Sequence, residues 1–291
     1  MYVNKIGLLD NDKQPICEFE YSSITKFNEI GLAVIEKVNS NSNESFTTKG
    51  LISETGKVIL PCDYSFIGST EGLTNSSSPI FMYGKYIKIR NKTNAYGIAD
   101  TQGNIIVPCI YEQLDFFEHD YFKFYKDDLV GLSHITDYNK VLLHCRYTKI
   151  SKYTNFMENL DAKTMDEEKN KYLVAQYTNG CDIIDINREA IIFSVYKEEA
   201  IIDVFLILKD CVVIRINKKN INTFRIYSKF ENKSNVYFEY SGIGNMNDRY
   251  VQVSKDSKWG IFDLNNYSEL IPCKYYENIG QFYMESGIGK Q

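Results

Sequence analysis

Four cysteines stand in a repeated setting, each two residues before a tyrosine. They are Cys62, Cys109, Cys145 and Cys273. Thiolates bind metals and form redox pairs, so this spacing could carry either chemistry. Equivalent positions in successive repeats lie farther apart than the ~7 Å between Cα atoms that a disulfide allows. We therefore interpret these residues as packed free thiols, and we expect all seven cysteines of the chain to be unpaired.

The histidines and carboxylates predict no catalytic or metal site. His119, His134 and His144 lack the spacing of a zinc pair, and the last two fall on different predicted strands. No nucleophile elbow, P-loop or dinucleotide-binding glycine motif is present in the required strand–turn–helix setting. Four aspartates follow equivalent strands, and we interpret them as turn formers: Asp10, Asp100, Asp185 and Asp263. We expect no catalytic residue, no metal and no cofactor.

Two markers recur together along the whole chain. Segments of the form Tyr-x-x-Ile end successive units at intervals averaging about 42 residues. A glycine opens most units 14 or 16 residues earlier, and Asp182 and Arg225 take its place in the fifth and sixth units. The seven endings lie near Tyr21, Tyr64, Tyr111, Tyr147, Tyr196, Tyr240 and Tyr276. We expect these tyrosines to anchor the core with the hydroxyl at its rim.

Each unit also contains a segment with the period-two alternation of a β-strand. These segments are residues 32–38, 86–92, 121–127, 172–178, 211–217 and 250–255. Turn residues such as those of ETGK and TQGN separate them from the neighbouring strands. The pattern predicts antiparallel sheets of three strands, or four if the Tyr-x-x-Ile segment pairs as well.

The units that contain KWGIFD, AYGIAD, TKGLIS and KIGLLD, followed by VILPCDYSFI, IIVPCIYEQL or LIPCKYYENI, resemble WG-type repeats. The resemblance covers the whole chain and is close in the first three units and the last. Only the last unit keeps the tryptophan, Trp259. The family is a bacterial array of short β-rich units, and the resemblance implies a non-catalytic repeat scaffold without a single activity.

The predicted fold is an all-β repeat protein of about seven units that forms one domain over residues 1–291. The first unit lacks an alternating strand, and residues 280–287 supply such a strand without a glycine-led strand after it. These halves are complementary, so we favour a seven-bladed β-propeller closed by pairing of the N- and C-terminal strands. An open β-solenoid array is the alternative.

Composition and charge limit the classes of partner. A formal net charge of −5 without a run of basic residues argues against a nucleic-acid surface. The N-terminal residues do not resemble a signal peptide, and the longest apolar run, around residues 201–208, is too short to cross a bilayer. We therefore expect a cytoplasmic protein that binds neither nucleic acid nor membrane.

Two long insertions follow Tyr-x-x-Ile endings, at residues 68–84 and 151–171. They carry aromatic and methionine side chains, which are enriched in interface cores. The predicted partner-binding residues are Phe81, Met82, Tyr83, Tyr153, Phe156 and Met157. The favoured function is a non-catalytic scaffold that binds another protein through these loops. A small-molecule or glycan sensor is the alternative, and an enzyme with an unrecognised site is the third reading.

Overall fold

A computed structural model describes residues 5–40, 45–68, 84–118, 120–153, 171–196, 201–207, 211–228, 237–246 and 249–276. Within these ranges all regular elements are β-strands, which confirms the all-β prediction. No helix of this part of the chain could span a membrane. The chain divides into two compact units, residues 1–145 and 146–291. The single domain over residues 1–291 stays a prediction.

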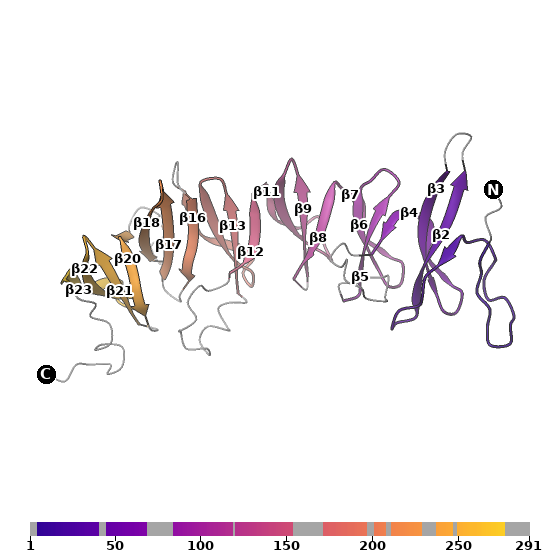
Figure 1. The fold of residues 1–291 in the computed structure, drawn as a ribbon, viewed down its shortest axis with the longest axis horizontal. Helices are drawn as coiled ribbons and strands as arrows, with labels where there is room; N and C mark the ends of the chain where they lie inside the picture. Colours follow the sequence, from indigo (N-terminus) through magenta and orange to yellow (C-terminus); the bar gives the residue numbers. More distant parts are fainter. Residues whose placement is uncertain are drawn as a thin grey trace. The chain divides into compact units, whose positions relative to one another are not determined.

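The strands form five antiparallel meanders, and within each sheet the strands pair in the order of the sequence (Figure 1). The first seven make one sheet, in which two four-stranded motifs share β4. Motif 1 consists of β1 (Ser23–Ile24), β2 (Leu32–Ser40), β3 (Ser45–Ser53) and β4 (Val58–Ile67). Motif 2 consists of β4, β5 (Tyr86–Asn91), β6 (Tyr96–Asp100) and β7 (Ile105–Tyr111).

The remaining sheets have four strands each. Motif 3 consists of β8 (Gln113–Phe117), β9 (Tyr121–Lys126), β10 (Leu129–His134) and β11 (Val141–Tyr147). Motif 4 consists of β12 (Lys149–Lys152), β13 (Tyr172–Tyr177), β14 (Gly180–Asp185) and β15 (Ala190–Tyr196). Motif 5 consists of β16 (Ile201–Ile207), β17 (Cys211–Lys218), β18 (Ile221–Ser228) and β19 (Tyr237–Tyr240). Motif 6 consists of β20 (Gly242–Met246), β21 (Tyr250–Lys255), β22 (Lys258–Asp263) and β23 (Ser268–Tyr275).

The six alternating segments predicted from the sequence are the second strands of the six motifs, which confirms them. The predicted boundary between units needs correction. Tyr111 ends the fourth strand of motif 2, whereas Leu114, at the end of the same Tyr-x-x-Leu segment, lies in β8 and opens motif 3. The strand at the end of each Tyr-x-x-Ile segment therefore belongs to the next motif as its first strand, and each motif has four strands.

The glycine of the third strand is required by a close approach of backbones. A Cβ atom on Gly97 would lie 2.5 Å from the carbonyl oxygen of Val107, and one on Gly260 would lie 2.4 Å from that of Ile271. In both motifs the pairing of the third and fourth strands is irregular at this point. The fourth strand bulges toward the glycine, and a larger residue would collide with its main chain.

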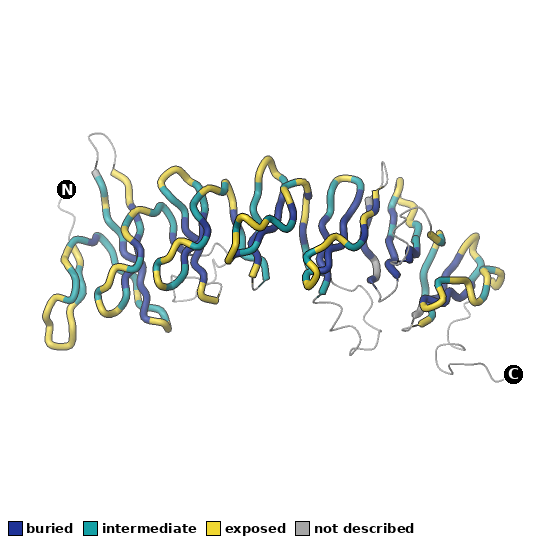
Figure 2. Tube along the Cα trace, turned by 180° about the vertical axis from the view of Figure 1, so that it is seen from behind, coloured by how far each residue is buried: buried dark blue, intermediate teal, exposed yellow. Residues whose placement is uncertain are grey.

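Within each compact unit the core lies between successive motifs, where apolar side chains of neighbouring sheets pack together. Val34 and Leu51 of motif 1 pack with Ile87 and Ile89 of motif 2. The same arrangement joins motif 4 to motif 5. Figure 2 shows the buried residues running along the strands, with exposed residues at the turns. Within a unit, each motif thus depends on a neighbour for burial, as expected for a repeat protein.

The repeated tyrosines divide into three groups, and Tyr64 and Tyr111 are partly buried. Tyr21, Tyr147 and Tyr240 are at most 3% exposed, as predicted for core anchors. Tyr196 and Tyr276 are 61% and 78% exposed, so the prediction is wrong for them. Residues 280–287 lie outside the described ranges. Closure into a seven-bladed propeller therefore stays a prediction.

Candidate functional site

Four carboxylates terminate third strands, or the equivalent N-terminal segment, and shape the turn that follows. In each case one carboxylate oxygen accepts hydrogen bonds from backbone N–H groups two to four residues later. This geometry confirms the sequence interpretation of these residues as turn formers. They are Asp10, Asp100, Asp185 and Asp263. One oxygen of each carboxylate is thus engaged by the turn.

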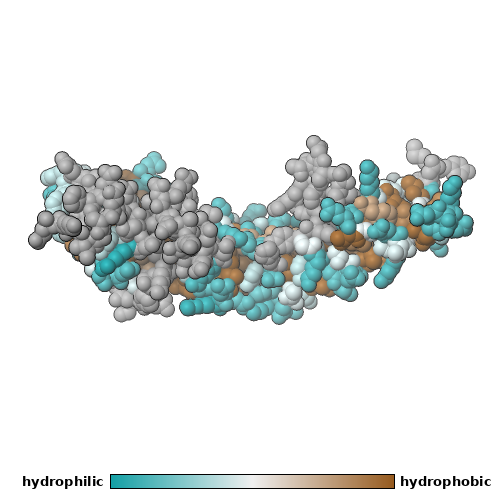
Figure 3. Space-filling model, turned by 90° about the horizontal axis from the view of Figure 1, so that it is seen from below, coloured by the Kyte–Doolittle hydropathy of each residue, from teal (hydrophilic) through white to brown (hydrophobic). Residues whose placement is uncertain are grey.

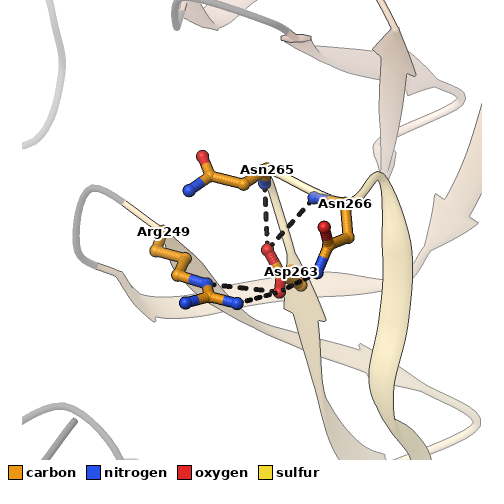
Figure 4. Close-up of polar contacts among 4 residues, drawn as sticks. All are labelled: Arg249, Asp263, Asn265 and Asn266. Atoms are coloured by element: carbon orange, nitrogen blue, oxygen red, sulfur yellow. Dashed lines mark hydrogen bonds and ion pairs between the residues drawn. The ribbon is translucent and has the colours of Figure 1, made fainter.

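Asp263 has the most complete set of partners (Figure 4). Its Oδ1 accepts hydrogen bonds from the backbone N–H groups of Asn265 and Asn266 at 3.0 and 3.2 Å. Its Oδ2 accepts from Nη2 of Arg249 at 3.1 Å and from Nδ2 of Asn266 at 2.9 Å. Burial opposes the ionisation of Asp263, but these donors outweigh it and hold the pKa of the carboxyl below its ordinary value.

A tyrosine begins the second strand directly opposite this turn. Tyr86 pairs with Asp100, Tyr172 with Asp185 and Tyr250 with Asp263. The residue before each tyrosine is basic, and its charged group lies over the ring. The distances to the ring centroid are 5.4 Å for Lys85, 5.2 Å for Lys171 and 5.0 Å for Arg249. We call this set of cation, tyrosine and aspartate the loop rim of a motif.

The loop rim lies at the end of the sheet where the first strand connects to the second. The insertion after β4 returns to the fold at Lys85 and Tyr86, and the insertion after β12 returns at Lys171 and Tyr172. Cation–π contacts and a hydrogen-bonded turn make this end of the sheet a firm attachment for a long connection.

The predicted partner-binding residues are mostly outside the described ranges. Phe81, Met82, Tyr83, Phe156 and Met157 fall there. Tyr153 is 4% exposed, and its hydroxyl accepts a hydrogen bond from the backbone N–H of Ile207 at 2.9 Å. It belongs to the core between motifs 4 and 5 and does not fit a surface contact.

All seven cysteines are free thiols. In three motifs the sulfur lies within hydrogen-bonding distance of the carbonyl oxygen on the second strand that faces the glycine. The distances are 3.9 Å from Cys62 to Ile35, 3.5 Å from Cys145 to Phe124 and 3.5 Å from Cys273 to Val253. Burial raises the pKa of Cys62 to about 11 and also raises the pKa of Cys109, Cys145 and Cys273. We interpret these four cysteines as structural thiols. Those of Cys62, Cys145 and Cys273 donate to the carbonyl oxygen of the second-strand residue that pairs with the glycine.

The histidines are spread over the fold. His119 lies outside the described ranges. His134, on β10, packs against Tyr121 with ring centroids 4.4 Å apart, and His144 is exposed on β11. In the described part of the chain no three His, Cys, Asp or Glu side chains are grouped so that they could hold a metal ion.

Two buried polar clusters were missed by reasoning from the sequence. Asp182 accepts hydrogen bonds from the hydroxyl of Tyr147 at 2.7 Å and from Nη2 of Arg146 at 2.8 Å. Lys88, only 3% exposed, donates to the carbonyl oxygen of Leu114 at 2.6 Å and to Oδ1 of Asp115 at 2.9 Å. The first cluster could have been suspected, because Asp182 stands where most units have a glycine. Nothing in the sequence indicated that Lys88 contacts Asp115.

Residues 50–73 and 96–129 match the family model described as the WG containing repeat. These two regions therefore match WG-type repeats, as the sequence resemblance implied for them. No curated protein matches the chain significantly.

Several solved structures are similar at low identity. A eukaryotic initiation factor is 13% identical with a TM-score of 0.32, covering 81% of this chain and 61% of its own. The β-propeller domain of Myceliophteria thermophila Cps50 (Swd1) is 12% identical with a TM-score of 0.26, covering 84% of both chains. AztD from Citrobacter koseri is 9% identical with a TM-score of 0.30, covering 92% of both. The chain spans about 61% of the initiation factor's length. TM-scores at this level do not establish a shared arrangement.

Proposed function

We propose that this WG-repeat chain is a non-catalytic protein-interaction scaffold whose partner binds the connections between the first and second strands of its motifs. One observation carries the proposal. The connection spans residues 68–85 between β4 and β5 and residues 153–171 between β12 and β13, but only residues 118–120 between β8 and β9. The connection between the third and fourth strands is four residues long in motifs 1, 2, 4 and 6. Extra length is thus concentrated where a binding loop would be carried.

The loop rim supports this role. In motifs 2 and 4 the returning end of the insertion is fixed by a basic residue over a tyrosine that begins a paired strand. Fixing the ends of a loop reduces the conformational entropy that it loses when a partner binds. The aromatic and methionine residues Phe81, Met82, Tyr83, Phe156 and Met157 are the contacts that we propose within these connections.

The experiment is a pull-down from a lysate of the source cells with the chain as bait. Replacing residues 69–83 and 154–170 with short Gly-Ser connections should abolish capture of a stoichiometric partner. The thermal unfolding midpoint should stay within a few degrees, because surface connections tolerate changes in length. The matched control replaces residues 41–44, between β2 and β3, with Gly-Ser and should keep capture intact.

Two outcomes would contradict the proposal. Full capture by the doubly shortened variant would place the partner elsewhere on the chain. A wild-type bait that returns no stoichiometric protein would favour the sensor of a small molecule or glycan. The seven free thiols support the further proposal of a reducing, cytoplasmic compartment.

A further inference from the structure

The N-terminal residues 5–21 form half of a motif. Isolated bridges join Ile6 to Tyr21 and Leu9 to Pro15. The third and fourth strands of motif 1 pair at the same positions relative to their glycine, Gly50. There Lys49 pairs with Tyr64 and Ile52 with Val58. Gly7 thus corresponds to Gly50, and residues 5–10 correspond to a third strand. Within the described ranges, no second strand pairs with them.

Side chains that complete motifs bury are exposed on this half motif. Leu9 is 49% exposed, whereas the equivalent Ile52, Ala99 and Phe262 are 0% exposed. Phe19 takes the place of the repeated cysteine and lies over Gly7, yet it is 48% exposed. Figure 3 shows hydrophobic residues at the surface of the N-terminal part of the chain. The half motif therefore presents an apolar surface that its own strands do not cover.

The backbone has an open edge on the same side. Ile6 exchanges hydrogen bonds with Tyr21, the carbonyl of Leu8 accepts from Ile16, and Asp10 donates to Gln14. Successive residues of an extended segment point their backbone groups to opposite sides. Gly7 and Leu9 therefore turn their N–H and C=O groups toward the place of the second strand. No backbone partner for either is found among the described residues.

We propose that residues 5–10 accept an antiparallel β-strand from a partner protein, an extended segment with apolar side chains at alternate positions and Lys or Arg between them. The complete motifs provide the template, because each places an alternating second strand beside its third strand. Addition of a strand would satisfy the open edge and cover Leu9. This site is separate from the insertions. A negative result for strand addition would therefore not affect the proposed partner binding by the insertions, and a negative result for the insertions would not affect strand addition.

Charge selects the kind of strand. Residues 5–21 contain four carboxylates, Asp10, Asp12, Glu18 and Glu20, and two lysines. Glu20 is already paired with Nζ of Lys37 on β2 of motif 1 at 2.7 Å, which leaves three carboxylates against the two lysines of residues 5–21. A basic strand is therefore favoured over an acidic one. Residues 280–287 of this chain contain one Glu and no Lys or Arg, so they suit the site less well.

The probe is a fluorescent peptide with the sequence of residues 84–92, GKYIKIRNK, titrated with the full chain by anisotropy. Leu9→Ser should weaken binding at least tenfold. The matched control Ile105→Ser changes an apolar residue that is 47% exposed on a fourth strand, and it should bind like wild type. A peptide with Pro in place of Ile89 should bind at least tenfold more weakly because it cannot extend the sheet. Hydrogen exchange of the Gly7 and Leu9 amides should slow when the peptide binds.

Three results would overturn the proposal. Equal binding of the proline peptide, or of a peptide with Glu at every basic position, would show that pairing or charge is not recognised. Unchanged affinity of Leu9→Ser would place the peptide elsewhere. Absence of binding to the full chain would reject a partner strand, and binding that emerges only after deletion of residues 280–291 would assign the edge to the chain's own segment.

Discussion

Motifs 1, 2, 3 and 6 differ from motifs 4 and 5 in the residue on the third strand that faces the fourth strand. In the first group a glycine stands on the third strand and a cysteine of the fourth strand lies beside it. In motif 4 the same position holds Asp182, bonded to Tyr147 and Arg146. In motif 5 it holds Arg225, which forms a 2.5 Å ion pair with Glu239.

The difference teaches what the position requires. A glycine lets the bulged fourth strand approach, and the thiol then donates to the second strand. Where a charged residue stands instead, it brings its own partner and satisfies its polar atoms in that way. In motif 4 the residue that faces Asp182 on the second strand is Ala175, smaller than Phe124 or Val253 at the equivalent places. The fold is kept although the sequence pattern is lost.

The largest expected effect comes from filling the glycine position. Gly97→Ala places a Cβ atom 2.5 Å from a main-chain carbonyl, so the backbone must shift. We expect a loss of about 3 kcal/mol in the free energy of unfolding, typical of severe overpacking. Urea denaturation of the full chain measures it.

Gly7→Ala is the matched control, because its Cβ would lie 3.0 Å from a carbon of the Phe19 side chain and 3.1 Å from the carbonyl oxygen of Glu18, both farther than the 2.5 Å at Gly97. That ring is half-exposed and can move, so the loss should be below about 1 kcal/mol. Equal losses at the two positions would contradict the argument from backbone approach.

The next effect tests the charged alternative. Asp182→Ala should cost about 2 kcal/mol, because the hydroxyl of Tyr147, a residue that is 0% exposed, loses its acceptor. Adding Tyr147→Phe to Asp182→Ala should recover part of this loss by removing the unsatisfied hydroxyl. A double-mutant cycle measures the coupling. Additive losses would mean that the two side chains do not act as a pair.

A smaller effect concerns pH and the pair formed by Lys88 and Asp115. Burial raises the pKa of Asp115. The hydrogen bond and the charge of Lys88 lower this pKa by more than burial raises it, so the pKa lies below its ordinary value of 3.8. A depressed carboxyl pKa stabilises the fold fully above about pH 4, and the contribution is lost as pH falls through the folded-state pKa.

Lys88→Met should cost about 1 kcal/mol at pH 7. It should also reduce the loss of stability on acidification below about pH 4, because the lowering of the pKa of Asp115 by Lys88 is then removed. Denaturant midpoints measured across this range check both expectations. An acid dependence identical to that of wild type would show that the pair does not contribute to it.

The strands could be predicted from the sequence because their pattern repeats. The side-chain contacts between strands could not be predicted. Alternation located all six second strands, and the turn-forming role of Asp263 followed from its place after a strand. The boundary of the motif was missed because Tyr-x-x-Ile looks like an ending, although its last residue pairs with the following strand. Tyr153 was misjudged because an aromatic residue beside an insertion carries no sign of whether it faces the core. Lys88 and Asp115 meet only through the packing of two motifs.

The smallest expected effect on stability, and the sharpest on reactivity, concerns the thiols of the glycine-bearing motifs. Burial raises the pKa of Cys62 from 9.0 to about 11, so at pH 8 its thiolate fraction is about a hundredfold lower than that of an unperturbed thiol. In the native chain Cys62 should therefore react with iodoacetamide about a hundredfold more slowly than after unfolding. Mass spectrometry of timed digests measures the rates, and unfolding without reductant should expose all seven thiols. Rapid native labelling of Cys62, or fewer than seven thiols after unfolding, would reject the packed-thiol interpretation. Cys62→Ser provides the matched test of packing, because its hydroxyl can still donate to Ile35, and it should shift the unfolding free energy by less than about 1 kcal/mol.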